Sequence, residues 1–257
     1  MTAIAITVFA LACADLARAG DRGRGWVWPV VTAVVAAVLG LVLLGAFSVA
    51  EILLVLFGVA VVAGWVLTTG REMRSRVDYA LPLGLLAGGL LVHVVALGWV
   101  PAREDDGLLG AWAEQVPLAG AMVSATTVLL VAGVMLAQLN TANIVVRLVL
   151  ASVGALKPAG QPQASDRLRG GRILGPMERL LILGLGLAGQ PTAAGLVIAA
   201  KGLIRFPELQ AQARWGVGRA SAGHEPGIDE ITEYFLIGSF VSWLFALVGL
   251  AFVLVFA

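Results

Sequence analysis

The chain has 257 residues, of which 60% are hydrophobic and 13% are charged, and its net charge is +1 at pH 7. Soluble globular proteins carry roughly a quarter charged residues, so this composition excludes an ordinary soluble domain and favours a protein that crosses a membrane several times. The small net charge gives no attraction for nucleic acid, and the single cysteine, Cys13, excludes an intramolecular disulfide.

Seven hydrophobic segments follow one another along the chain. They cover residues 2–18, 26–47, 50–69, 79–100, 118–139, 179–200 and 233–257. Each approaches the roughly 20 apolar residues that cross about 30 Å of hydrocarbon. Because the segments are apolar on every face rather than at alternate positions, we expect an all-α, polytopic membrane protein.

A very short connection, "AFSVAE" (Ala46–Glu51), joins the second and third segments. Ser48 followed three residues later by Glu51 is a capping-box pattern, in which the two side chains satisfy backbone N–H groups at a helix start. We therefore expect segments 26–47 and 50–69 to form an antiparallel hairpin.

Helical character continues beyond the fifth segment to about Leu156. Asn140, Asn143 and Arg147 follow at i, i+3 and i+7, a spacing that places them on one helical face. This pattern predicts a helix on the cytoplasmic side with a polar face.

A stretch rich in Pro, Gly, Ser and Gln, residues 157–172, predicts a flexible linker in solvent. It divides the chain into two predicted parts. Residues 1–156 form an N-terminal transmembrane bundle of five spans with the cytoplasmic-side helix, and residues 173–257 form a C-terminal transmembrane part.

Arginines in the short loops predict the orientation, because cytoplasmic loops are rich in Lys and Arg. Such arginines follow the first and third segments, whereas the loop after the fourth has Arg103 beside four acidic residues. We expect the N-terminus outside and the 18–25, 70–78 and 140–179 loops in the cytoplasm. The bias toward Arg, Ala, Gly and Val suggests a bacterial protein, and hence the cytoplasmic (inner) membrane.

The sixth segment, 179–200, allows two interpretations. As one straight helix it is about 33 Å long and crosses the membrane, but it then puts Lys201, Arg205 and two further arginines outside. A re-entrant hairpin that breaks at Gly189–Pro191 keeps them inside. The straight span is the first interpretation, because its length fits a single crossing.

Two kinds of residue predict local packing. Tryptophans near span ends are typical of the membrane interface, and they are Trp26, Trp28, Trp65, Trp99 and Trp112. Gly84 and Gly88 form a small-xxx-small pair, which predicts a close approach between helices.

Ionisable residues inside a span are costly, so they are candidates for function. Asp15 lies in the first span and His93 lies deep in the fourth. A hydrogen bond to a neighbouring helix is the first explanation for His93, and a proton relay or ligand contact is the second. One Cys and two His cannot complete an ordinary zinc site, and "GLGLAG" (Gly184–Gly189) follows no strand, so we expect no metal or cofactor.

Charged residues gather at the ends of the last two segments. They are Glu178, Arg179, Lys201, Arg205 and Glu233, with Tyr234 beside the last. The i, i+4 spacing of Lys201 and Arg205 puts both on one helical face, where they could hold an anionic group. Glu233 is their expected ion-pair partner in the straight interpretation, and Glu178 joins them in the hairpin interpretation.

Three stretches of the C-terminal part, "GRILGPMERLLIL", "AGQPTAAGLVIAAKGLIRFPEL" and "EYFLIGSFVSWL", resemble a family of bacterial integral membrane proteins of unknown function. The resemblance covers about residues 170–245. It implies that the residues of the charged group, together with Phe206 and Gly238, are the positions to watch, and it implies no established activity.

Three functions fit these patterns. The first is a membrane transporter or channel-like protein, oligomeric, that handles an anionic or lipid-phosphate ligand near Lys201 and Arg205. The second is a membrane-embedded enzyme that acts on a lipid headgroup, with Glu178 or Glu233 as the acid or base. The third is a membrane scaffold or effector in which the charged group is a structural lock. The expected partners are membrane lipids, further copies of the chain or another membrane protein, and an anionic small molecule.

Overall fold

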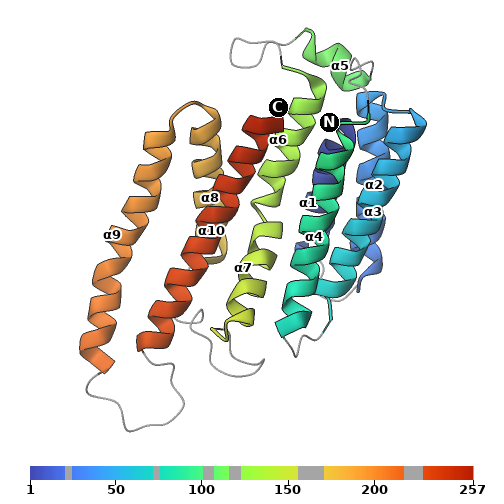
Figure 1. The fold of residues 1–257 in the computed structure, drawn as a ribbon. Helices are drawn as coiled ribbons and strands as arrows, with labels where there is room; N and C mark the ends of the chain where they lie inside the picture. The colour runs from blue at the N-terminus through green and yellow to red at the C-terminus, as the bar shows by residue number, and fades with distance from the viewer. Residues whose placement is uncertain are drawn as a thin grey trace. The chain divides into compact units, whose positions relative to one another are not determined.

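The computed structural model describes residues 1–20, 25–71, 76–100, 107–115, 123–155, 171–216 and 228–256. All regular elements in these ranges are helices (Figure 1), as the sequence predicts. They are α1 (Thr2–Gly20), α2 (Val27–Leu44), α3 (Val49–Thr69), α4 (Arg76–Ala96), α5 (Leu108–Ala113), α6 (Ala125–Ala137), α7 (Thr141–Ser152), α8 (Gly171–Leu187), α9 (Pro191–Gly216) and α10 (Ile228–Phe256). The predicted linker, 157–172, lies outside the described residues up to the start of α8.

Four helices are long and apolar enough to cross a membrane. The stretches are Val27–Leu44 in α2, Val49–Thr69 in α3, Val77–Ala96 in α4 and Glu233–Phe256 in α10. Taken together, α6 and α7 make a fifth candidate, a span broken between Ala137 and Thr141. These helices indicate a multi-pass membrane protein, although the predicted count of seven spans is not confirmed in the described part of the chain.

The chain forms two compact units, one of residues 1–141 with 251–257 and the other of residues 142–250. We call them the N-terminal and C-terminal units. In the N-terminal unit α1 is the central helix, and it contacts α2, α3, α4 and α6. Most of its residues between Ala3 and Ala14 are buried, as expected of a helix that is apolar on every face and surrounded by protein.

Glycines of the neighbouring helices bring their backbones close to α1. A Cβ atom added at Gly58 would lie 2.1 Å from Thr7 Oγ1, and one added at Gly133 would lie 2.9 Å from the backbone nitrogen of Phe9. By contrast, a Cβ at Gly84 or Gly88 would meet nothing within 4 Å. The predicted close packing through Gly84 and Gly88 is therefore wrong for the described residues, because this face of α4 has no near neighbour there.

The predicted turn between the second and third segments is present. The Ser48 hydroxyl accepts a hydrogen bond from Glu51 N at 3.3 Å, and Glu51 Oε2 accepts one from Ser48 N at 3.3 Å. This reciprocal pair is the predicted capping box. It starts α3 at Val49, a few residues after Gly45. Gly45 ends α2 and has a φ of 66°, in the left-handed region.

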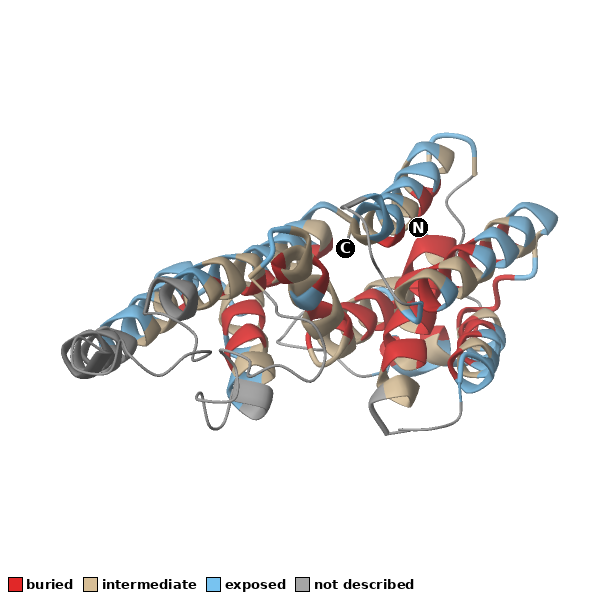
Figure 2. Cartoon of the chain, turned by 90° about the horizontal axis from the view of Figure 1, so that it is seen from below, coloured by how far each residue is buried: buried red, intermediate tan, exposed pale blue. Residues whose placement is uncertain are grey.

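Burial separates Trp65 from the other tryptophans that were expected at the membrane interface. Trp65 is 0% exposed, whereas Trp26, Trp28, Trp99 and Trp112 are all exposed. The interfacial interpretation is therefore wrong for Trp65, because its indole is packed inside the N-terminal unit. Figure 2 shows the general pattern, with buried residues on the inner faces of the helices and exposed residues on the outer faces.

In the C-terminal unit the sixth predicted segment is broken into two helices. Gly189 adopts φ 71°, and the N–H of Gln190 reaches back to Leu185 O at 2.8 Å, which ends α8 in a Schellman motif. Pro191 begins α9, which then packs against α8. The straight helix over 179–200 is therefore wrong, and the break falls at Gly189–Pro191, as in the alternative interpretation.

An apolar core fills the C-terminal unit between the hairpin of α8 and α9 and the helix α10. Its buried centre is Ile182, Ala194 and Ala246, one residue from each helix. Leu185, Val197, Ile198 and Trp243 pack around that centre. This core lies on the turn side of the charged residues described next.

Candidate functional site

The register of the α8–α9 hairpin brings two predicted site residues together. Glu178 lies about 14 Å from the end of α8, and Lys201 lies about 15 Å from the start of α9, at 1.5 Å per residue. In an antiparallel hairpin, equal distances from the turn place two residues at one level. Glu178 and Lys201 therefore face each other across the two helices, below the apolar core.

The two side chains form an ion pair that a tryptophan completes. Lys201 Nζ lies 2.5 Å from Glu178 Oε2, and Trp243 Nε1–H donates to Glu178 Oε1 at 2.7 Å. Lys201 Nζ also lies 5.6 Å from the centre of a Trp243 ring, within the range of a cation–π contact. Three helices thus contribute one side chain each.

The neighbouring arginine binds two uncharged side chains. Arg179 is 2% exposed, and its guanidinium donates to Ser242 Oγ at 3.0 Å and to Asn143 Oδ1 at 2.7 Å. These contacts tie α8 to α10 and α7. We call Glu178, Arg179, Lys201, Ser242, Trp243 and Asn143 the Glu178 cluster.

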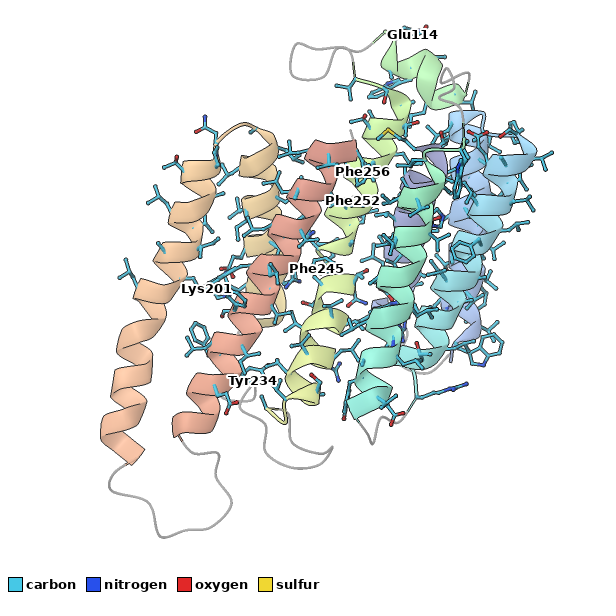
Figure 3. All side chains as sticks on the ribbon, in the orientation of Figure 1. Glu114, Lys201, Tyr234, Phe245, Phe252 and Phe256 are labelled. Atoms are coloured by element: carbon cyan, nitrogen blue, oxygen red, sulfur yellow. The ribbon has the colours of Figure 1, made fainter. Side chains whose placement is uncertain are left out.

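The Glu178 cluster lies level with the middle of the apolar stretch of α10. Trp243 is about 15 Å along α10 from Glu233 and about 20 Å from Phe256, the two ends of the candidate span. Figure 3 labels Lys201 beside the middle of α10, well beyond Tyr234. If α10 crosses the membrane, the ion pair is near mid-depth, where an ionisable group is costly unless it is paired.

Burial leaves Lys201 partly accessible. Its side chain is 17% exposed, whereas the Glu178 side chain is 6% exposed. Toward the hairpin turn the cluster meets the apolar core of Ile182, Ala194 and Ala246.

The remaining predicted residues of the C-terminal part lie elsewhere. Glu233 is exposed and Tyr234 is half-buried at the start of the apolar stretch of α10. Among the described residues Glu233 makes no ion pair with Lys201. Arg205 belongs to α9, but its side chain lies outside the described residues, so its predicted sharing of an anion with Lys201 stays a prediction.

The polar residues predicted to share one helical face have separate surroundings. Asn140 lies in the break between α6 and α7, where its amide donates to the backbone oxygen of Asp15. Asn143 is on α7 and binds Arg179, and Arg147 on the same helix is exposed.

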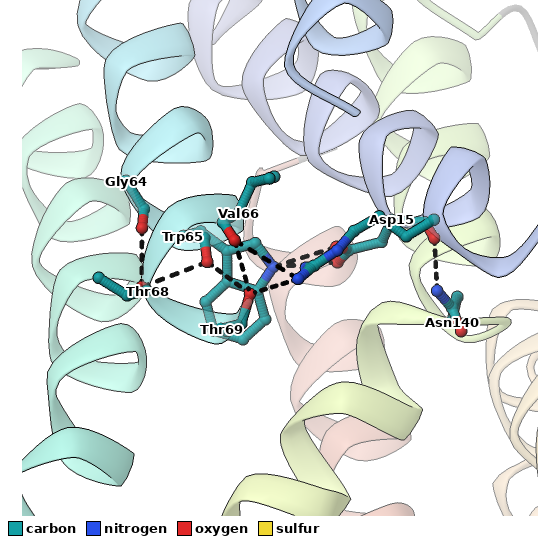
Figure 4. Close-up of polar contacts among 8 residues, drawn as sticks. Asp15, Gly64, Trp65, Val66, Thr68, Thr69 and Asn140 are labelled. Carbon is teal, nitrogen blue, oxygen red and sulfur yellow. Dashed lines mark hydrogen bonds and ion pairs between the residues drawn. The ribbon is translucent and has the colours of Figure 1, made fainter. Parts of the chain in front are cut away.

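A second polar cluster surrounds Asp15 in the N-terminal unit (Figure 4). Asp15 is 0% exposed, and its carboxylate accepts from Arg18 at 3.2 Å and from Trp65 Nε1 at 3.2 and 3.1 Å. Arg18 also donates to Thr69 Oγ1 at 2.8 Å. The Asp15 carboxylate of α1 is thus paired with Arg18 one turn later and hydrogen-bonded to Trp65 of α3. This arrangement holds α1 and α3 together and indicates a structural role.

His93 connects three helices of the same unit. Its Nδ1 lies 2.8 Å from Gly89 O in its own helix, and its Nε2 lies 3.2 Å from Leu54 O of α3. The Nε2 atom is also 3.1 Å from Thr7 Oγ1 of α1. His93 is 2% exposed, so these contacts match the first explanation given for it, a hydrogen bond to neighbouring helices.

Sequence reasoning did not assign Ser242 and Trp243 to the charged group, and it placed Asn143 on a separate polar face. Ser242 and Trp243 lie in "SFVSWL" within an apolar helix, and Ser239 and Ser242 are both buried. Their i, i+3 spacing marks one polar stripe on α10, which is the signal that could have identified the face turned toward α8. Nothing in the spacing of Asn143 points to Arg179.

The described residues contain no group of three or more His, Cys, Asp or Glu side chains that could hold a metal ion. Comparisons with family models, with curated proteins and with solved structures find no match to this chain. The resemblance of residues 170–245 to a family of bacterial membrane proteins therefore stays a prediction.

Proposed function

We propose that this protein is a membrane transporter or channel-like protein that takes an anionic group at Lys201. The observation that carries the proposal is the Glu178–Lys201 ion pair, with Glu178 buried and Lys201 partly exposed, level with the middle of the apolar stretch of α10. Ionisable residues at that depth are characteristic of substrate and ion pathways.

The donors of Lys201 favour an oxyanion as the ligand. An ammonium group has three N–H donors, and in the described contacts one points to Glu178 and the ring of Trp243 lies on another side. Charge-assisted N–H bonds to phosphate or carboxylate oxygens are short and strong. The shared chemistry is therefore an oxyanion, such as the phosphodiester of a lipid headgroup or a soluble phosphodiester.

The hairpin also supports the orientation proposed for the chain. Because α9 runs back along α8, the start of α8 and the end of α9 point to the same end of the hairpin. With the N-terminus outside, both then lie in the cytoplasm, and Arg103 remains in the outer loop. This arrangement follows the preference for basic residues in cytoplasmic loops and suits a bacterial inner membrane.

Cysteine labelling tests that orientation. In a Cys13→Ala background, single cysteines replace Ser165 or Ser221, and intact cells are treated with a membrane-impermeant maleimide. We expect both positions to be protected until the cells are lysed, and a cysteine at the exposed Glu114 of the loop after α4 to label at once. Labelling of the two serine positions on opposite sides would show that 179–200 crosses the membrane.

Binding to the purified protein tests the function. The probes are dimethyl phosphate, a soluble phosphodiester, and phosphatidylglycerol in nanodiscs, which presents the same group on a lipid. We expect at least tenfold weaker binding of one probe when Glu178→Gln and Lys201→Gln are combined. This double variant removes both members of the ion pair at once, so neither Glu178 nor Lys201 is left charged without the other.

The control is Arg147→Ala, which removes one exposed cation from the same unit and should bind as the wild type does. Equal binding by the double variant and the wild type would refute the proposal. If the double variant instead lost only thermal stability, the pair would be a structural lock. Release of glycerol or phosphate from the lipid would indicate the enzyme.

A further inference from the structure

We propose that Glu178 is an internal competitor of the anion at Lys201, and that Arg179 balances the charge of Glu178 once an anion has displaced it. The inference rests on the proposed function and names how the same site is regulated. It follows from the contacts of the two carboxylate oxygens and from the place of Arg179 beside Glu178 on α8.

The Glu178 carboxylate already fills the place of a bound oxyanion. Its Oε2 atom lies 2.5 Å from Lys201 Nζ, and its Oε1 atom accepts a hydrogen bond from Trp243 Nε1 at 2.7 Å. The two donors come from α9 and α10, and each binds a different oxygen. Carboxylates and phosphodiesters present the same kind of charged oxygen to such N–H donors. Lys201 and Trp243 therefore bind an oxyanion in this structure, and it is the side chain of Glu178.

An anion from outside must compete with this carboxylate. If it approached a second N–H of Lys201 while Glu178 stayed bound, two negative charges would share one ammonium group, and their repulsion is strong where water is scarce. Anion binding is therefore expected to separate Lys201 from Glu178 Oε2. Lys201 is the partner suited to move, because its ammonium group ends a flexible four-carbon stem. Its side chain is also 17% exposed, against 6% for Glu178.

Arg179 supplies a second positive charge for Glu178. It is the next residue on α8, and the two charges attract each other. Its guanidinium is held by Ser242 Oγ at 3.0 Å and by Asn143 Oδ1 at 2.7 Å. Side chains of consecutive helical residues point about 100° apart, and accordingly Arg179 contacts α7 whereas Glu178 contacts α9. Arg179 therefore stays in place when Lys201 moves.

The charges balance before and after the exchange. Without an anion, Glu178 is paired with Lys201 and has Arg179 beside it. With an anion bound, the charge of the anion faces Lys201 and the charge of Glu178 faces Arg179. Neither negative charge is left without a positive neighbour, the condition that makes a buried ion pair costly to break, so the exchange requires no proton. Trp243 keeps its bond to Oε1, and Glu178 stays attached to α10.

Calorimetry of dimethyl phosphate binding to the purified protein tests the competition. Glu178→Gln keeps the size of the side chain and an acceptor for Trp243 but removes the competing charge. Because close charge pairs are coupled by at least that much, we expect the variant to bind at least roughly tenfold more tightly than the wild type. Phosphatidylglycerol nanodiscs, titrated in the same way, distinguish a lipid phosphodiester from a soluble one.

Arg179→Gln tests the role of the second charge. Without the attraction of Arg179, the pair of Glu178 with Lys201 is harder to open, so we expect binding at least roughly tenfold weaker than in the wild type. Arg179→Lys keeps the positive charge and should bind nearly as the wild type does.

The double variant, Glu178→Gln with Arg179→Gln, distinguishes this positioning role from a structural one. It lacks the competitor, so it should bind more tightly than the wild type although Arg179 is absent. It removes one negative and one positive charge, and it therefore serves in place of Glu178→Gln if the single variant does not fold. An arginine with a structural role alone would weaken binding to the same extent with and without Glu178.

Three results would overturn the inference and leave the proposed function standing. The first is that neither the Glu178→Gln protein nor the double variant binds more tightly than the wild type. The second is an equal loss on replacing Arg179 in both backgrounds. The third is uptake of one proton per bound anion by the wild type, counted in two buffers with different ionisation enthalpies. If neither probe binds the wild type, the proposed function fails first.

Discussion

Replacing Gly133 with alanine tests how closely α6 packs against α1. The new Cβ would lie 2.9 Å from the backbone nitrogen of Phe9 and 3.0 Å from its Cα. Both are backbone atoms of a buried helix, so no side-chain rotation relieves the contact and the two helices must separate. Overpacking of this kind costs roughly 1–3 kcal/mol, and the better helix propensity of alanine offsets up to about 1 kcal/mol. We expect a net loss of about 1–2 kcal/mol in the free energy of unfolding.

Equilibrium unfolding in mixed micelles measures this loss, and Gly84→Ala is the matched control. Gly84 also lies within a helix, but a Cβ there meets nothing within 4 Å. The control should therefore be neutral or more stable than the wild type, by up to about 1 kcal/mol. A Gly133→Ala protein as stable as the Gly84→Ala protein would refute the close approach of α6 to α1.

Three further substitutions test contacts of single residues, each measured by the same unfolding assay. Asp15→Asn should cost about 1–3 kcal/mol, less than for a fully buried ion pair, because its partner Arg18 is 20% exposed; no loss would mean that the pair is not formed. Gly189→Ala should cost about 1–2 kcal/mol, the usual penalty for a side chain in the left-handed region, since a Cβ there meets nothing within 4 Å; a smaller loss would argue against the Schellman turn. Ser48→Ala should cost about 0.5–2 kcal/mol through loss of the helix cap, and an unchanged stability would contradict the capping box with Glu51.

Features that depend on neighbouring residues in the chain were predicted well. The capping box of Ser48 and Glu51 is an example, because both partners lie within one helical turn. The helices α2, α3 and α4 follow from length and apolar composition alone. Their ends differ by a few residues from the predicted segments, since hydropathy marks the apolar stretch and hydrogen bonds mark the helix.

Burial inside the protein could not be predicted from the same signal. The first segment was expected to be a span, and the structure shows that α1 is a buried helix with α2, α3, α4 and α6 in contact with it. Lipid chains and apolar side chains are chemically alike, so an apolar sequence does not show which of them covers a helix. The burial of Trp65 illustrates the same limit, because its partner Asp15 lies fifty residues away on α1.

At the α8–α9 hairpin, the prediction gave more weight to the length of the apolar segment than to the turn residues within it. The sequence "GQP" at Gly189–Pro191 contains a glycine for the helix end and a proline for the next helix start. Length argued for a straight span, because the apolar residues on both sides of the break add up to one crossing. In the structure the local backbone preference determines the path, and the count of apolar residues does not.

The choice between the two paths also determines which carboxylate pairs with Lys201. A straight helix would have placed Lys201 at the membrane surface, near Glu233 at the start of the last span. In the hairpin Lys201 lies level with Trp243, and about 15 Å of helix separates that level from Glu233. Glu178 is then the carboxylate within reach. The pairing of Lys201 with Glu178 was therefore accessible from sequence once the turn at Gly189 was accepted, whereas the contribution of Trp243 depends on the rotation of α10, which no spacing within α8 and α9 determines.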